Sequence, residues 1–204
     1  MAVHKFSGKE YETVLNDGLN ELGMSLNEVL VTSTEVKAGL FKGTNVEVTI
    51  TPLIDVLEYA KEFLSDTIQN MGLEVRFETQ LREDQMKIKM YSNDNPLLIG
   101  HAGKNLAALQ TVVRAVIKNK FGKTPYISLD VENYKDKQLM YLEKTAKRIA
   151  REVSETKIAV ELDNMNSYER LIVHNAVAEF NDVYTVSVGE EPNRHVIIKP
   201  KEEQ

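Results

Sequence analysis

Two glycines three residues apart place the tightest constraint on the fold of this chain. Residues 96–110 read PLLIGHAGKNLAALQ, so Gly100 and Gly103 stand between two apolar stretches with helical spacing. One glycine is enough to end a helix. The second glycine therefore indicates a turn whose backbone must stay open to a close neighbour. We predict two helices joined by an exposed glycine loop.

Apolar periodicity divides the chain into three segments that each mix helices with short strands. Helices are predicted from Gly8, capped by Ser7, to about Leu22, over Leu53 to Met71, from the glycine loop to about Lys120, over about Asn133 to Thr156, and from an Asn166–Glu169 capping box to about Asn181. Strands are predicted at residues 29–31, 46–50, 73–80, 86–90, 126–131, 158–162, 183–188 and 195–198. Hydrophobic residues make up 42% of the 204 residues, which is enough for compact folding. We expect the α+β class, with three small α/β domains in series at residues 1–52, 53–131 and 132–204.

One loop of the first segment holds an apolar pair between glycines. It runs from Lys37 to Gly43 and contains Leu40 and Phe41. Two interpretations remain open. The pair could tuck under the small sheet as part of a turn, or it could be an exposed docking site.

The charge of the chain is distributed unevenly. The net charge is -6, which by itself argues against a nucleic-acid partner. Between Asn95 and Leu129, however, there is no Asp or Glu, while Lys and Arg occur five times. Such a window is either an ordinary solvated lysine face or an anion-binding face. Its position beside the glycine loop favours anion binding.

The loop has the chemistry needed to hold a phosphate backbone. Without Cβ atoms at Gly100 and Gly103, a sugar-phosphate chain can approach the main chain closely. The helix that starts at Gly103 offers free N–H groups and the positive end of its dipole, and Lys104 adds a formal charge. A loop of this kind can clamp about four nucleotides of a single strand.

Other residue patterns argue against catalysis and against membrane insertion. The chain has no cysteine, and its four histidines have no sequence partners at metal-ligand spacing. Glu161 and Asp163 could pair as acid and base, but they are expected at a strand end and a helix cap. The N-terminus is charged and lacks an apolar h-region, and no apolar run reaches spanning length. We expect a soluble cytoplasmic protein that is not an enzyme and uses no cofactor or metal.

The second segment resembles a type II KH domain. The resemblance rests on Leu97-Leu98-Ile99, on Leu106-Ala107-Ala108-Leu109-Gln110, and on the order helix, strand, strand, short helix, long helix, strand. It implies binding of single-stranded RNA at a loop where KH domains commonly carry a basic residue and this chain has His101 and Ala102. The implied RNA-binding residues are Ile99, which floors the base groove, Gly100, His101, Ala102, Gly103 and Lys104 at the loop, and Arg114 and Lys118 for longer-range attraction.

The third segment looks like the RxxxH single-stranded-nucleic-acid-binding domain. Residues 165–174 read MNSYERLIVH, and residues 189–200 read GEEPNRHVIIKP. Arg170 and His174 are four residues apart and share a helix face, while Leu171, Ile172 and Val173 are expected on the buried side. Members often carry a second arginine where Leu171 stands. The implied phosphate contacts are Arg170, His174, Arg194 and Lys199.

The whole chain resembles the Jag family of bacterial SpoIIIJ-associated proteins. Residues 6–9 (FSGK), 21–23 (ELG) and 37–41 (KAGLF) are similar to its N-terminal domain, and the KH and RxxxH domains follow in that family's order. The resemblance implies a cytoplasmic protein that binds single-stranded RNA, or single-stranded DNA, as a post-transcriptional or cell-envelope and elongation regulator.

A second interpretation assigns the chain a different class of function. It is an adaptor whose KH domain pairs with a small KH-domain protein or with itself, and whose N-terminal domain docks a partner near the membrane. Salt dependence separates the two, because phosphate contacts weaken steeply with added salt.

Overall fold

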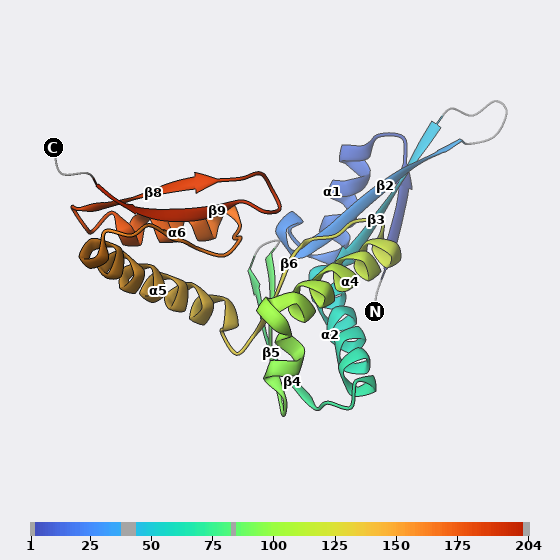
Figure 1. The fold of residues 1–204 in the computed structure, drawn as a ribbon. Coiled ribbons are helices and arrows are strands. Elements are labelled where there is room, and N and C mark those ends of the chain that lie inside the picture. Colours follow the sequence, from blue (N-terminus) through green and yellow to red (C-terminus); the bar gives the residue numbers. More distant parts are fainter. Residues whose placement is uncertain (1–2, 38–43, 83–84, 202–204) are drawn as a thin grey trace. The chain divides into compact units, whose positions relative to one another are not determined.

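The computed structural model of the chain describes residues 3–37, 44–82 and 85–201. These residues form two compact units, Met1–Glu132 and Asn133–Gln204. Helices and small three-stranded sheets alternate in both units, which confirms the predicted α+β class (Figure 1). The division into three domains stays a prediction.

The first part of unit 1 is one helix on a three-stranded antiparallel sheet. Its elements are β1 (His4–Gly8), α1 (Tyr11–Leu22), the 3-10 turn η1 (Leu26–Glu28), β2 (Val29–Lys37) and β3 (Thr44–Pro52). The strand order is β1-β3-β2. The buried core of Val14, Val29, Val48 and Ile50 joins the inner face of α1 to the sheet. As predicted, α1 ends at Gly23, which has φ 63°.

The predicted start of the first helix is wrong. Residues 4–8 form the edge strand β1, so Ser7 is not a cap, and the helix begins at Tyr11 after Glu10. The strand alternates, with Phe6 against the core and Lys5 outside, where its ammonium pairs with Glu47 of β3 at 2.9 Å. A five-residue strand with one large apolar residue gives too little periodicity to be told from a helix start. The loop with Leu40 and Phe41 lies outside the described residues.

The second part of unit 1 packs two long helices on a mixed sheet. Its elements are α2 (Leu53–Asn70), β4 (Val75–Arg82), β5 (Gln85–Ser92), α3 (Asn95–Ile99), the 3-10 turn η2 (His101–Gly103), α4 (Lys104–Phe121) and β6 (Tyr126–Val131). The strand order is β4-β5-β6, with β4 antiparallel and β6 parallel to β5. The central strand is buried at Met86, Ile88 and Met90. The predicted helices and strands of this part are confirmed to within two or three residues.

Unit 2 is a two-helix layer on a three-stranded antiparallel sheet. Its elements are α5 (Tyr134–Thr156), β7 (Val160–Glu161), α6 (Ser167–Val177), β8 (Val183–Val188) and β9 (His195–Pro200). The strand order is β7-β9-β8, and Figure 1 shows both helices on the same side of the β8–β9 pair. The core lies between them and includes Ile149, Val153, Val173, Val177 and Ile198.

Two predicted elements of unit 2 are longer than the structure has them. The helix α6 ends at Val177 rather than near Asn181, and the predicted strand 158–162 is paired only over Val160–Glu161. Ile158 is exposed, so its apolar side chain does not extend the strand. In the part of the chain that the structure describes, we find no helix with the length and apolar character needed to cross a bilayer.

Candidate nucleic-acid interface

The glycine loop joins α3 to α4 through a backbone that mostly has positive φ. Gly100 ends α3, and its N–H donates to the carbonyl of Pro96 at 2.8 Å. The φ angles of Gly100, Ala102 and Gly103 are 70°, 51° and 77°. Positive φ is open to glycine at little cost and strains most other residues. The two glycines therefore make this turn possible, and Ala102 adopts an unusual conformation for a residue with a Cβ.

Gly100 is also required by a close neighbour within the chain. A Cβ built at Gly100 would lie 2.5 Å from Cγ of Asn105. The Asn105 Nδ2 donates to the carbonyl of Leu97 at 2.8 Å, which ties the first turn of α4 to the end of α3. The close approach expected at this glycine is therefore made first by Asn105, whatever else approaches the loop.

The N-terminus of α4 is open to an anion. Gly103 provides no side-chain cap, and the first turn of α4 contains no acidic residue. The first N–H groups of a helix lack intrahelical partners and carry the positive end of its dipole. Around them His101, Ala102 and Lys104 are exposed. The loop thus combines free backbone donors with a lysine.

The remaining predicted residues of this site lie at increasing distance from the loop. Ile99 is half-buried directly before Gly100. Arg114 and Lys118 are ten and fourteen positions past Lys104 on α4, which puts them about 15 and 21 Å along the helix axis. They are therefore not part of the loop itself.

Arg114 has a structural contact of its own. Its Nη2 donates to the carbonyl of Ile127 at 3.1 Å, and one turn earlier Gln110 Oε1 accepts from the N–H of Leu129 at 3.1 Å. Both backbone groups belong to β6, at the edge of the sheet. The two α4 side chains satisfy main-chain groups that an edge strand would otherwise leave free.

The sequence prediction missed an exposed tyrosine beside these cations. Tyr126, 55% exposed, lines a shallow hollow together with Arg114, Lys118 and Pro125. It alternates along β6 with the buried Ile127. That alternation could have identified Tyr126 as an outward-facing aromatic next to a basic helix.

In unit 2 the predicted capping box at the start of α6 is confirmed. The Asn166 side chain accepts from the N–H groups of Tyr168 and Glu169, and Glu169 Oε2 accepts from the N–H of Asn166 at 2.9 Å. This fixes where α6 begins, and with it the direction of Arg170 and His174.

Arg170 is buried and engaged with its own domain. It is 9% exposed. Its Nη1 donates to the carbonyl of Met165 at 2.7 Å and to Glu191 Oε1 at 2.8 Å, while Nη2 donates to Ser167 Oγ at 2.8 Å. The guanidinium therefore holds the turn before α6 and the loop before β9 together.

The other predicted residues of unit 2 do not converge on one face. His174 is exposed, and its Nδ1 lies 2.7 Å from Thr185 Oγ1 on β8. Arg194 is exposed near Arg170, since its carbonyl accepts from the N–H of Met165 at 3.0 Å. Lys199 alternates with the buried Ile198 on β9, so it faces away from the helices. The structure brings Arg170 and Arg194 together and separates Lys199 from them.

The expectation that Leu171 is buried is wrong. Val173 is fully buried and Ile172 is half-buried, but Leu171 is 51% exposed. It follows the buried Arg170 directly, and one step along a helix turns a side chain by about 100°. Three adjacent apolar residues cannot all face one core.

Polar side chains in the described ranges are arranged as structural pairs. Glu161 Oε1 lies 2.8 Å from His195 Nε2, so this carboxylate, which with Asp163 is the candidate acid–base pair of the sequence, contacts a histidine of β9. No group of three histidine, aspartate or glutamate side chains within residues 3–37, 44–82 and 85–201 is placed to hold a metal ion.

Comparison with known proteins assigns the family. A family model described as the KhpA/KhpB KH domain matches residues 56–129, and the model of the RxxxH domain matches residues 140–200. A Clostridium symbiosum protein named RNA-binding protein KhpB is 39% identical over 146 residues, or 71% of this chain and 66% of that protein. The chain belongs to the KhpB family. The Jag resemblance, with its KH and RxxxH domains in series, is thereby confirmed.

Other members of the KhpB family differ in how much of their length this chain spans. The Bacillus subtilis (strain 168) protein of the same name is 27% identical over 201 residues, which cover 96% of this chain and 97% of that protein. The match to the Streptococcus pneumoniae D39 protein is 26% over 147 residues and covers 45% of its length. The chain spans just under two thirds of the Clostridium symbiosum relative. None of these three KhpB relatives carries the name of an enzyme.

Proposed function

We propose that this chain binds single-stranded RNA, with the glycine loop and the N-terminus of α4 as its main phosphate site. The observation that carries the proposal is the uncapped start of α4, which has no acid in its first turn and has Lys104 beside it. A helix N-terminus of this kind binds phosphate oxygens through its backbone N–H groups. In this proposal His101 and Ala102 lie under the phosphates, and the half-buried Ile99 floors the groove for the bases.

The cations farther along α4 play a different part in the proposal. Arg114 and Lys118 attract the strand electrostatically and flank the hollow beside Tyr126. Tyr126 offers a stacking surface for a base, since exposed aromatic rings next to basic grooves bind single strands with little sequence preference. RNA that starts at the loop and follows α4 would reach them.

In unit 2 the proposal assigns direct phosphate contact to His174 and Arg194. Arg170 keeps a positioning role, because its donors already bond Met165, Ser167 and Glu191. Lys199 faces the other side of the sheet and contributes at most long-range attraction.

The relatives support this proposal through their names, which describe them as RNA-binding proteins. We further propose a cytoplasmic, non-enzymatic regulator that needs no cofactor, in keeping with the family. Single-stranded DNA would satisfy the same phosphate donors. Competition between RNA and DNA strands of the same sequence tests which of them the protein prefers, because only RNA carries the 2′-hydroxyl.

The loop assignment can be tested with a charge change that keeps the loop shape. Replacing His101 and Ala102 with Asp puts two carboxylates under the proposed phosphates, whereas replacing both with Asn changes size equally without charge. Asp and Asn both tolerate positive φ better than most residues. We expect the Asp pair to weaken binding of a short single-stranded RNA about tenfold or more relative to the Asn pair, or about 1.4 kcal/mol.

The measurement is fluorescence anisotropy with both variants at equal thermal stability. Equal RNA affinities of the Asp and Asn pairs would contradict the loop assignment. The wild-type affinity should also fall steeply with added salt.

A second candidate function has one structural observation in its favour. The motif arginine of the RxxxH domain, Arg170, is already bonded within its domain, which leaves the surface of that domain with fewer free cations. An adaptor that pairs through its KH domain, with itself or with a small KH-domain protein, and docks a partner through its N-terminal domain would need none. Such pairing would respond weakly to salt, so a salt-insensitive complex together with negligible RNA affinity would favour the adaptor.

A further inference from the structure

Helix α5 carries a face that the core of unit 2 does not use. Its inner side is buried at Ala146, Ile149, Ala150 and Val153. The opposite side, here called the α5 outer face, consists of Met140, Tyr141, Lys144, Arg148 and Arg151. All five residues are exposed, with Tyr141 at 72% and Met140 at 70%.

The cations of this face are available, unlike their neighbour Lys147. The ammonium of Lys147 pairs with Glu143 at 3.0 Å and with Glu179 at 2.8 Å, and hydrogen bonds to these two carboxylates, Glu179 foremost, raise its pKa. Within the described ranges, Lys144 and Arg151 form no ion pair. Arg148 has one loose contact, 3.4 Å to Glu152, with a side chain that is 67% exposed. Paired Lys147 thus belongs to the fold, and the other three cations remain free to meet an anion.

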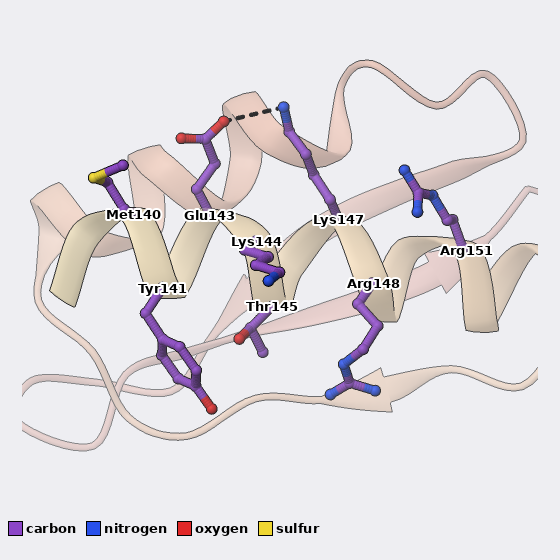
Figure 2. Close-up of a pocket in the computed structure, with 8 residues that line it drawn as sticks. All are labelled: Met140, Tyr141, Glu143, Lys144, Thr145, Lys147, Arg148 and Arg151. Atoms are coloured by element: carbon purple, nitrogen blue, oxygen red, sulfur yellow. Dashed lines mark ion pairs between the residues drawn. The ribbon is translucent and has the colours of Figure 1, made fainter. Parts of the chain in front are cut away.

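The side chains of the face are spaced along a single line. Tyr141, Lys144, Arg148 and Arg151 follow one another at intervals of three or four residues, which keeps them on one side of a helix. Figure 2 shows Tyr141 and Arg148 extending from the same side of α5, with Lys144 and Thr145 between them. Over ten residues the line is about 15 Å long. Glu152 and Glu155 bound it at the C-terminal end.

This combination fits single-stranded nucleic acid better than other partners. Single strands present phosphates and open base faces together, and they are bound by cations that follow the backbone and aromatic rings that stack on bases. A length of about 15 Å matches roughly four stacked nucleotides at about 3.4 Å each. A membrane surface would need the apolar side of the helix, and that side is in the core.

We propose that the α5 outer face is a further contact surface for single-stranded RNA, with Tyr141 stacking on a base and Lys144, Arg148 and Arg151 holding the backbone. The proposal rests on the RNA-binding function argued above and adds a surface distinct from the glycine loop and from the RxxxH motif residues. Met140 extends the apolar platform beside Tyr141.

The absence of tryptophan from the chain allows a direct optical test. Tyr141→Trp in the full-length protein introduces a single tryptophan on the α5 outer face. The matched control is Tyr11→Trp, at an exposed tyrosine of α1. On titration with a CA-repeat RNA of about 20 nucleotides, we expect base stacking to quench the tryptophan on α5 with the same midpoint as overall binding. The fluorescence of the α1 control should stay unchanged.

Affinity variants test the aromatic and the charges separately. Tyr141→Ala removes no core contact, and we expect about a fivefold or greater loss of affinity for the same RNA. Lys144→Gln with Arg151→Gln should lower the slope of log affinity against log salt by about two. The control pair Lys9→Gln with Lys87→Gln alters the net charge equally on exposed residues of unit 1 and should leave the slope unchanged.

The outcomes separate this proposal from the proposed function. Should the wild type fail to bind the RNA, both fall. Should the wild type bind, the Asp loop pair lose binding and the α5 variants behave like wild type with the α5 tryptophan unquenched, the α5 surface alone is overturned. Loss of binding to polyglutamate in the charge variant, with RNA affinity intact, would also overturn it and would point to an acidic protein partner.

Discussion

Arg170 shows how a single residue can fit a binding motif and still serve the fold. Its spacing from His174 predicts a phosphate contact on a shared helix face. In the structure its guanidinium is buried and bonds a carbonyl, a hydroxyl and the carboxylate of Glu191. A buried cation that loses its partners is costly, and so are partners that lose their cation.

Replacing Arg170 with Ala should therefore destabilise unit 2 by about 2 kcal/mol, because the Met165 carbonyl loses its donor. Denaturant unfolding monitored by circular dichroism measures this. Arg194→Ala, at an exposed neighbour, is the control and should unfold like wild type while weakening RNA binding. Normal stability of the Arg170 variant with a lower salt slope for RNA would instead make Arg170 a phosphate contact.

At the scale of elements, contacts between successive helices and strands decide how each site is presented. The turn between α3 and α4 is held by Asn105, and the free edge of β6 is covered by Gln110 and Arg114. In unit 2, the end of α5 is joined to the segment before β8, because Ser154 Oγ donates to the carboxylate of Asp182. That bond, followed by the positive charges of Lys157 and Lys201, lowers the pKa of Asp182, although desolvation opposes the shift.

The lowered pKa of Asp182 predicts a pH dependence of stability. A carboxyl group whose pKa is lower in the folded state stabilises the fold above its unfolded pKa, about 3.9, and loses that contribution as pH falls through the folded value. We expect Asp182→Asn to lower the melting temperature at pH 7, with the gap to wild type closing below about pH 4. Glu155→Gln, an exposed carboxylate on α5, serves as the control. A gap that is constant from pH 7 to pH 3 would show that the charge of Asp182 is not involved.

At the scale of the whole molecule, an acidic chain displays local basic surfaces. The net charge is -6, yet the start of α4 and the outer face of α5 each present cations with few acids near them. Local potential, rather than the sum, governs the approach of a polyanion. The acidic remainder should disfavour non-specific binding to nucleic acid.

The division into two compact units predicts independent folding. Unit 2 has its own core between α5, α6 and its sheet. A fragment of residues 133–204 should therefore unfold cooperatively, with the helical circular dichroism expected for α5 and α6. A fragment without a cooperative thermal transition would show that this core needs unit 1.

Local patterns were sufficient to predict most elements and the position of the glycine loop. Long amphipathic helices such as α2 and α5, the Asn166 capping box and the glycine at the end of α1 all depend on residues within a few positions of one another. Short elements were missed or overextended, as with β1 and β7, because a few residues carry too little periodicity. The RNA-binding residues themselves remain proposals.

The sequence by itself determined the α+β class, the family and the two motifs, because these depend on the order and spacing of neighbouring residues. Only the tertiary structure decided which motif residues are free. Arg170 meets Glu191 from 21 residues away, Arg114 meets the β6 backbone, and the outward turn of α5 leaves Tyr141 and Lys144 exposed. Such partners are distant along the chain, and whether a cation is spent on the fold or left for a ligand depends on what packing brings next to it.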